Sequence, residues 1–234
     1  MSSSVACIGI DLTTGRRPFV CAALDHELNA FGFLEGGLDE ALAWLDDFPE
    51  SLVAVNAASR LARDPSGRAA ERDLLARGVS VPPTPHRETL CPARTRLGLS
   101  FYKQLEKKSF RPHPTDRADH QWIETNSHAA FCALLGRAPL PRRTLEGRLQ
   151  RQLVLYEQDL NIADPMDFFE EITRHRLLAG QLPMEKLSTS AHLDALAAAY
   201  VAWLTTNRPA ETTRLGTNGD GFIVLPVGEM QEKN

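Results

Sequence analysis

The chain has 234 residues, 43% of them hydrophobic and 24% charged, with a formal net charge of −4, which is ordinary for a globular protein. No apolar run reaches the roughly eighteen residues that a membrane-spanning helix needs, and the first residues lack the basic segment of a signal peptide. We therefore expect a cytoplasmic protein without a membrane partner. The four cysteines are scattered without a C-x-x-C pair, which argues against a zinc site.

The first part of the chain predicts an antiparallel meander, then a helix and a buried strand. Segments 5–11, 18–24 and 28–34 have the pattern of strands, and the short turns between them indicate antiparallel pairing. Hydrophobic residues recur at helical spacing over 38–47, whereas 52–56 is continuously apolar, as in a strand covered on both faces. The order strand, strand, strand, helix, strand predicts an α/β fold with a mixed sheet.

The rest of the chain predicts mostly helices. Residues 57–118 are interpreted as a basic insertion of loops and helices within one domain that spans 1–234. Helices are expected in the insertion over 66–77 and 94–108. After it we expect a strand at 121–124, helices over 127–135, 144–156, 166–179 and 191–204, and a short terminal strand over 221–226.

Charge is distributed unevenly along the chain. Residues 1–56 carry nine acidic and two basic side chains, whereas residues 57–111 carry five acidic and twelve basic ones. A basic block beside an acidic one is suited to hold a polyanion over metal ligands. The alternative is a solvated insertion whose basic residues pair with acids elsewhere, and the sequence favours neither.

Three of the predicted strands end at a polar residue that can bind a metal, and a fourth such residue lies in a predicted helix. Asp11 and Glu124 each follow an apolar strand, although a turn cap and a helix N-terminal acid are their ordinary alternative roles. Asp194 shares a helix face with small alanines, so a buried carboxylate there needs a partner, either a metal or an arginine. Carboxylates gathered at one end of a sheet suit Mg²⁺.

An ordered set of motifs resembles the family called domain of unknown function 429, described as predicted nucleases with an RNase H-like fold. The motifs span nearly the full chain in the family's order: Ile8-Gly9-Ile10-Asp11, Val53-Ala54-Val55-Asn56-Ala57, Arg68-x-x-Glu71-Arg72 before Gly78, Glu124-Thr125, Thr144-x-x-Gly147, the alanine-rich segment 193–199 and the segment 221–226. The resemblance implies an RNase H-like mixed sheet, in which a three-strand antiparallel meander is joined to parallel strands and flanked by helices.

The resemblance also implies a function. It suggests hydrolysis of a phosphodiester by a nuclease that uses two divalent ions, Mg²⁺ or Mn²⁺. The substrate would be nucleic acid or another phosphodiester, with its phosphate oxygens held by Arg68 and Arg72. The implied catalytic carboxylates are Asp11, Glu124 and Asp194, and the implied metal ligands are these three together with Asn56.

Asn56 departs from the family's pattern, which usually has an aspartate at this place. An amide oxygen can bind a metal but brings no negative charge, so affinity for Mg²⁺ should fall. The alternative is therefore a catalytically inactive RNase H-like module that binds nucleic acid or a protein partner. A third possibility, an ATPase of the sugar kinase and actin type, ranks last because Thr13-Thr14-Gly15 only faintly resembles the glycine-rich phosphate hairpin of that class. Arg142 and Arg143, just before a predicted helix, are weaker candidates for holding phosphate, and a role as surface charges is favoured for both.

Overall fold

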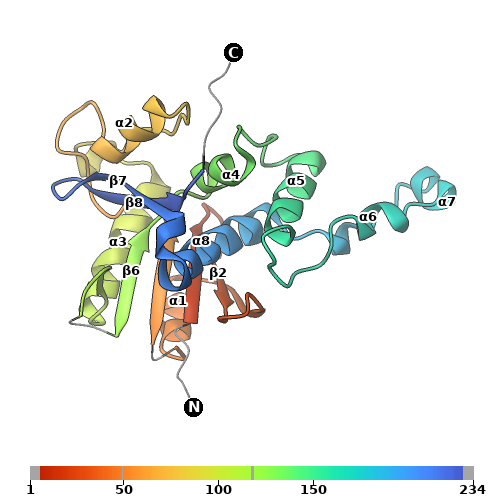
Figure 1. Ribbon diagram of the computed structural model, residues 1–234, viewed down its shortest axis with the longest axis horizontal. Helices are drawn as coiled ribbons and strands as arrows, with labels where there is room; N and C mark the ends of the chain where they lie inside the picture. Colours follow the sequence, from red (N-terminus) through yellow and green to blue (C-terminus); the bar gives the residue numbers. More distant parts are fainter. Residues whose placement is uncertain (1–5, 49, 117–118, 229–234) are drawn as a thin grey trace.

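The structure, a computed structural model, describes residues 6–48, 50–116 and 119–228 (Figure 1). Its centre is an eight-stranded mixed sheet with the order β3-β2-β1-β4-β6-β8-β7, and a short β5 also pairs with β6. The strands are β1 (Ala6–Leu12), β2 (Phe19–Leu24), β3 (Ala30–Gly36), β4 (Ser51–Asn56), β5 (Arg111–Pro112), β6 (His120–Glu124), β7 (Thr212–Thr217) and β8 (Gly221–Pro226).

Strand directions follow from the connections between the strands. Short turns make β1, β2 and β3 an antiparallel meander, whereas crossovers that contain helices place β4, β6 and β8 parallel to β1 and to one another. A meander followed by parallel strands is the RNase H-like arrangement, so the predicted fold class is confirmed. The β7–β8 hairpin extends the sheet beyond that core.

Helices cover both faces of the sheet. They are α1 (Leu38–Leu45), α2 (Ala69–Ala76), α3 (Ala93–Lys107), α4 (Ser127–Leu135), α5 (Leu145–Tyr156), α6 (Asp167–Glu170), α7 (Arg174–Leu178) and α8 (Ser190–Asn207). One hydrophobic cluster joins α8, α4 and α5 to one face, and a second joins α1 and α3 to the other. Because strand side chains alternate, β1, β2, β4 and β6 each contribute to both clusters.

Helix α8 lies directly against β1. A Cβ at Gly9 would lie 1.9 Å from the carbonyl oxygen of Ala195, so only glycine permits this approach of helix and strand. The alanines at 195 and 197–199 are completely buried and keep the helix close to the sheet. This contact sets the position of Asp194, which belongs to the same turn of α8.

Three segments differ from the sequence prediction, and one of them is the short strand β5, which lies within the predicted loops and helices of 57–118. The expected helix 166–179 is divided into α6 and α7, because the side chain of Thr173 accepts the N–H of Arg176 and begins a new helix. Strand β7 was not predicted, because its mostly polar sequence lacks a clear apolar face. The first residue of the predicted strand 5–11 lies outside the described residues.

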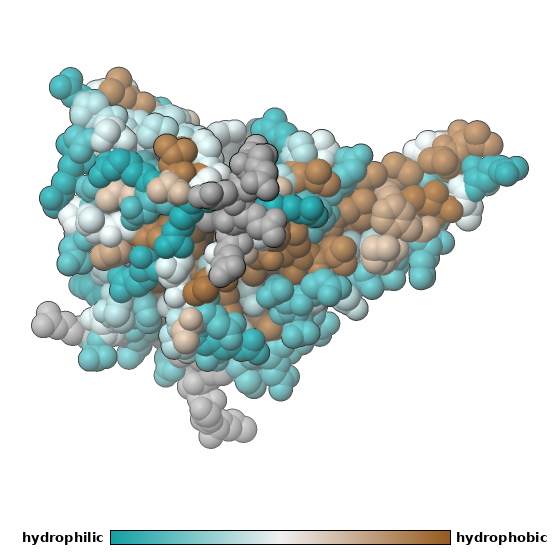
Figure 2. Space-filling model, turned by 45° about the horizontal axis from the view of Figure 1, so that its top comes forward, coloured by the Kyte–Doolittle hydropathy of each residue, from teal (hydrophilic) through white to brown (hydrophobic). Residues whose placement is uncertain are grey.

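Helices α6 and α7 form an extension that projects from the body of the molecule (Figure 1). Phe168 is the buried anchor of α6, and α7 buries no residue. Hydrophobic residues gather on the surface of this extension (Figure 2), and the exposed ones include Phe169, Leu177 and Leu178. No helix in the described part of the chain is both long and apolar enough to cross a membrane.

Candidate functional site

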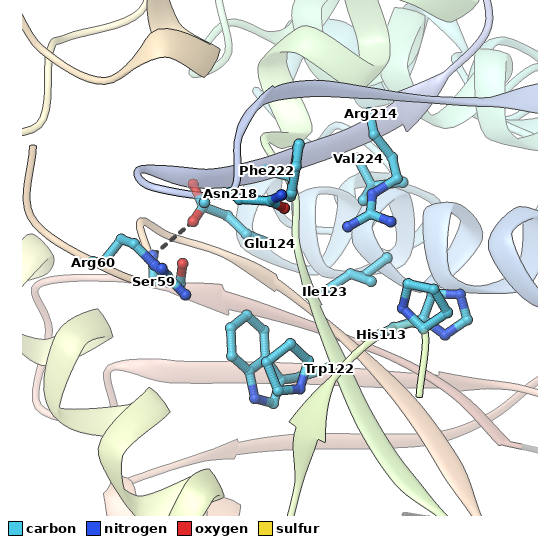
Figure 3. Close-up of a pocket in the computed structure, with 13 residues that line it drawn as sticks. Ser59, Arg60, His113, Trp122, Ile123, Glu124, Arg214, Asn218, Phe222 and Val224 are labelled. Atoms are coloured by element: carbon cyan, nitrogen blue, oxygen red, sulfur yellow. Dashed lines mark hydrogen bonds between the residues drawn. The ribbon is translucent and has the colours of Figure 1, made fainter. Parts of the chain in front are cut away.

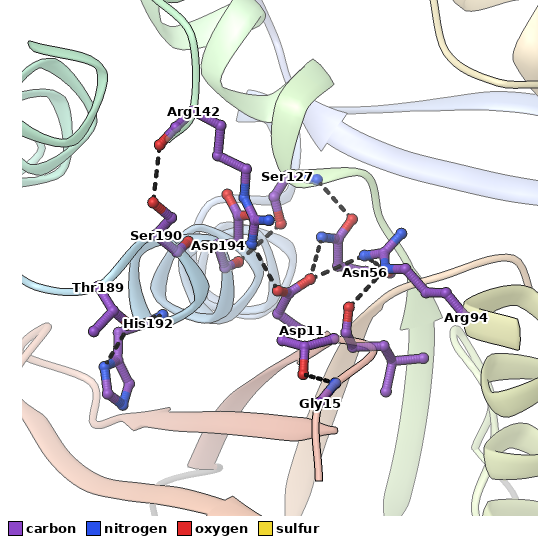
Figure 4. A network of polar contacts seen from close by, with 12 residues as sticks. Asp11, Gly15, Asn56, Arg94, Ser127, Arg142, Thr189, Ser190, His192 and Asp194 are labelled. Atoms are coloured by element: carbon purple, nitrogen blue, oxygen red, sulfur yellow. Dashed lines mark hydrogen bonds and ion pairs between the residues drawn. The ribbon is translucent and has the colours of Figure 1, made fainter. Parts of the chain in front are cut away.

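Asp11 and Asn56 form the centre of the candidate site. They are paired in the register of the parallel strands β1 and β4 and lie on the face covered by α8. The Asn56 side-chain amide donates from Nδ2 to Oδ1 of Asp11 at 2.7 Å, while its own Oδ1 accepts the backbone N–H of Ser127 at 3.0 Å (Figure 4). The N–H at the start of α4 therefore orients the amide so that its NH₂ group faces Asp11.

Asp194 approaches Asp11 from α8, and Arg142 bridges the two carboxylates. Nη2 of Arg142 lies 3.1 Å from Oδ2 of Asp11, and its Nε lies 2.5 Å from Oδ2 of Asp194 (Figure 4). Burial, and then the neighbouring charge of Asp11, raise the pKa of Asp194 from its ordinary 3.8 to about 6, against the opposing effect of Arg142. The pair of carboxylates is thus held together by a cationic side chain.

Arg94, at the start of α3, closes the other side of Asp11. Its Nη2 donates to Oδ1 of Asp11 at 2.9 Å and to the carbonyl oxygen of Asn56 at 2.8 Å, and its Nε donates to the carbonyl oxygen of Leu12 at 2.6 Å. Asp11 is only 1% exposed, whereas the side chains of Arg94 and Arg142 are 42% and 40% exposed. The aspartate is buried, but its two arginines reach the surface.

A cavity of about 380 Å³ opens beside these residues. Three arginines line it, Arg94, Arg142 and the buried Arg151, but among the described residues the only acidic one in its lining is Asp194. Arg151 is fixed by the carbonyl oxygens of Leu140 and Gly147. The positive side chains outnumber the negative one, so the cavity favours an anion.

A second cluster of charged residues surrounds Glu124. Arg68 binds both oxygens of this carboxylate, and its Nε also donates to Oε1 of Glu71 at 3.0 Å. Thr84 donates to Glu71 from both its backbone and its hydroxyl, and the backbone N–H of Ser59 donates to Glu124 at 2.7 Å. Arg68 and Glu124 are each 2% exposed and Glu71 is 7% exposed, so the charged groups of this cluster are buried, at the wall of a cavity of about 240 Å³.

The sheet register explains why Glu124 is separated from Asp11. Glu124 pairs with Val55 rather than with Asn56, and Val55 points into the cluster of α1 and α3. Neighbouring residues of a strand face opposite sides of the sheet. The side chain of Glu124 therefore belongs to the face opposite that of Asp11 and Asn56.

The structure thus divides the residues singled out from the sequence. It brings together Asp11, Asn56 and Asp194, and it places Glu124 with Arg68 in the separate buried cluster. Arg72 lies apart from both carboxylate groups, and its Nη1 donates to the carbonyl oxygen of Gly67 at 2.7 Å. The expected role of Arg68 and Arg72 in binding substrate stays a prediction, although the contacts of Arg68 are those of a structural ion pair.

The observed arrangement does not fit a divalent ion. Both carboxylate oxygens of Asp11 accept bonds from nitrogen donors, and the amide oxygen of Asn56 is occupied by the N–H of Ser127. Within the described residues, no group of three or more histidine, cysteine or acidic side chains is placed to hold a metal. Binding of Mg²⁺ or Mn²⁺ remains an untested prediction.

Sequence reasoning missed the two arginines of the site. Arg142 is only a weaker phosphate-binding candidate in the sequence, with a surface charge as the favoured role, but it contacts both Asp11 and Asp194. It lies in the loop before α5, where no periodic pattern indicates which way a side chain points. Arg94 belongs to the basic block of 57–111, so its charge was visible but its partner was not.

Comparison with known proteins identifies a family. The model of the family described as "Protein of unknown function (DUF429)" matches residues 9–214. Neither a curated protein nor a solved structure matches the chain at a significant level. The matched residues include the whole Asp11 site and the whole Glu124 cluster. Because the match covers most of the sequence, the chain belongs to the DUF429 family.

Proposed function

We propose that this protein is an RNase H-like module that binds phosphate groups of nucleic acid through Arg94 and Arg142 and does not cleave them with a metal. One observation carries the proposal: the two carboxylates are already neutralised by side chains of the protein, while the arginines that neutralise them remain about 40% exposed. An anion can reach these arginines without displacing any group from Asp11.

The guanidinium geometry supports phosphate as the ligand. Asp11 is bound by Nη2 of both arginines, and no hydrogen bond joins the Nη1 of either one to a described residue. A guanidinium is planar and presents its N–H groups in a fixed fork that matches phosphate oxygens. Asp11 therefore acts as a positioning residue, which holds the Nη2 group of each guanidinium so that its Nη1 group can bind a ligand.

Metal-dependent hydrolysis of a phosphodiester is the second candidate. The observation that favours it is the raised pKa of Asp194, which reflects two carboxylates buried close together. A divalent cation would relieve this repulsion more strongly than the single charge of Arg142. Asn56 opposes this candidate, because it supplies its NH₂ group rather than an oxygen toward Asp11.

The test is binding of fluorescently labelled single- and double-stranded DNA and RNA over a salt series, followed by anisotropy. We expect salt-sensitive binding by the wild type and a loss in the Arg94→Gln/Arg142→Gln double variant, with the salt slope reduced by about two. The control is Arg137→Gln/Arg143→Gln, which removes the same charge from two exposed arginines nearby. Equal binding by both double variants would overturn the proposal.

The same samples test the second candidate. The wild type and Asp11→Ala are incubated with each nucleic acid in Mg²⁺ and in Mn²⁺, and the products are separated on a gel. We expect no cleavage by either protein. Cleavage by the wild type that disappears in Asp11→Ala would replace binding with metal-dependent hydrolysis as the function of the site.

A further inference from the structure

A second cavity, separate from the Asp11 site, lies on the sheet where β6 meets the β7–β8 hairpin (Figure 3). Its volume is about 370 Å³, within the range of small-molecule sites. Trp122, Phe222 and Val224 contribute its apolar surface, and Arg60, Arg214, Asn218 and His113 are among its polar residues. The combination of aromatic rings and cations indicates a ligand that is both flat and negatively charged.

The cations of this cavity are not used by the fold. Among the described residues, Arg60 makes no hydrogen bond or ion pair, and Arg214 makes only a stacking contact, with its guanidinium carbon 4.4 Å from the centre of the Phe222 ring. In the described part of the chain, the only acidic residue of the lining is Glu124, and Arg68 already neutralises it. The cavity therefore has a net positive charge that no described side chain balances.

The aromatic side chains supply surfaces for a planar ring. Phe222 is partly exposed and carries Arg214 on its face, so a base can stack beside this pair. Trp122 forms another wall, and its Nε1–H is buried without an acceptor among the described residues. His113 lies near Arg214 (Figure 3), and burial lowers the pKa of its imidazole, which keeps the ring neutral at pH 7.

The position of Arg60 relates this cavity to the Asp11 site. Arg60 and Ser59 lie on the side of the cavity toward Glu124, opposite Arg214 and His113 (Figure 3). Glu124 also lines a neighbouring cavity of about 240 Å³, whose wall includes Asn56 and Arg94. The cavities are thus neighbours at the carboxyl ends of β4 and β6: two of them share Glu124, and the second shares Asn56 and Arg94 with the cavity beside Asp194.

We propose that the cavity binds one nucleotide, with its base against Phe222 and Trp122 and its phosphate on Arg60. The nucleotide is either a free nucleoside monophosphate or the terminal residue of a strand held by Arg94 and Arg142. Only the second source depends on the function proposed above. The chemistry at the cavity is the same in both cases, a stacked base with a phosphate on its exposed side.

The primary test is calorimetric titration with AMP, GMP, CMP and UMP, with the matching nucleosides and inorganic phosphate as partial ligands. We expect at least one monophosphate to bind more tightly than its nucleoside or phosphate alone. Phe222→Leu and Arg60→Gln should each weaken this binding about tenfold. Arg77→Gln is the control, because Arg77 is exposed at the end of α2 and is outside the cavity lining.

Two results would overturn this inference. One is the absence of binding by any monophosphate to the wild type, and the other is binding that Phe222→Leu and Arg60→Gln leave unchanged while circular dichroism shows both variants folded. The Arg94→Gln/Arg142→Gln variant should bind free monophosphate as tightly as the wild type does. Failure of the function proposed for the Asp11 site can therefore be distinguished from failure of this inference.

A final comparison distinguishes the two sources of the nucleotide. A 5′-phosphorylated hexanucleotide that binds the wild type more tightly than the monophosphate, but loses this advantage in Arg94→Gln/Arg142→Gln, supports the end of a strand as ligand. Equal affinity for the hexanucleotide and the monophosphate supports the free nucleotide. Both results require the cavity, because Phe222→Leu should weaken binding in each case.

Discussion

Two arginine–carboxylate clusters of this protein use the same chemistry at opposite levels of exposure. Around Glu124, the single Arg68 is 2% exposed and donates to two carboxylates, which also accept bonds from Ser59 and Thr84. Around Asp11, the carboxylate is buried but its arginines are 42% and 40% exposed. A closed cluster holds parts of the fold together, whereas an open one leaves N–H groups for a ligand.

The largest expected effect comes from breaking the closed cluster. Arg68→Met should destabilise the protein by about 3–5 kcal/mol, because it leaves Glu71 and Glu124 buried without their cation. Urea unfolding at pH 7 measures this change. The control, Arg72→Met, loses only the bonds to Ser66 and Gly67 and should cost less than about 1.5 kcal/mol. Similar losses in the two variants would contradict a structural role specific to Arg68.

The open cluster should make stability depend on pH through Asp194. The folded carboxyl keeps its proton to a pH of about 6, whereas an unfolded one releases it near 3.8, so the folded state binds more protons between these values. The stability from this difference is complete below about pH 4 and is lost as the pH rises through 6, by at most roughly 3 kcal/mol. Unfolding of the wild type and Asp194→Asn from pH 4 to 7 measures it, and parallel curves would refute the expectation.

Asn56→Asp should reduce stability by a smaller amount, and a bound metal should reverse the loss. The change replaces the donor to Asp11 with a like charge at the same place, and we expect a loss of about 1–3 kcal/mol in EDTA at pH 7. Added Mn²⁺ should restore stability, because a cation then takes the place of the amide NH₂ group. Asn126→Asp is the matched control, since aspartate caps α4 equally well through the N–H of Ala129. Thermal unfolding with and without Mn²⁺ gives the comparison, and equal stability of Asn56→Asp and wild type in EDTA would contradict the assigned amide orientation.

The smallest effect on stability is expected from Arg142→Gln. Its side chain is 40% exposed and Arg94 remains on Asp11, so the loss should be about 1 kcal/mol or less. The pKa of Asp194 should nevertheless rise further, because Arg142 is one of the groups that lower it. Carbon NMR titration of the Asp194 carboxyl detects this rise. An unchanged pKa would show that Arg142 does not contact Asp194 in solution.

The sequence predicted the strands of the sheet more accurately than it predicted which polar residues lie together. Alternation and short turns located the strands of the meander, and the continuous apolar run located β4. Asp11 and Asn56 could be placed at one edge of the sheet because each ends a strand. Their joint contact with Asp194 also required the close approach of α8 at Gly9, which no periodicity reveals.

The position of Glu124 was not predictable, because it depends on the register between β4 and β6. A shift of one residue moves a side chain to the opposite face of a sheet, and the two strand ends look equivalent in the sequence. The pairing of Val55 with Glu124 decides the matter. Arg142 was missed for another reason, since a loop residue carries no pattern that indicates its partner 131 residues away.

The contact at Gly9 also determines how the site keeps its shape. The carbonyl oxygen of Ala195 lies where a side chain of residue 9 would begin, so the backbone of α8 packs directly on that of β1. The backbone positions of Asp11 and Asp194 are therefore fixed by packing rather than by a ligand. Binding at Arg94 and Arg142 then displaces neither guanidinium from Asp11, and association should proceed at a rate set by diffusion and ionic strength rather than by rearrangement of the fold.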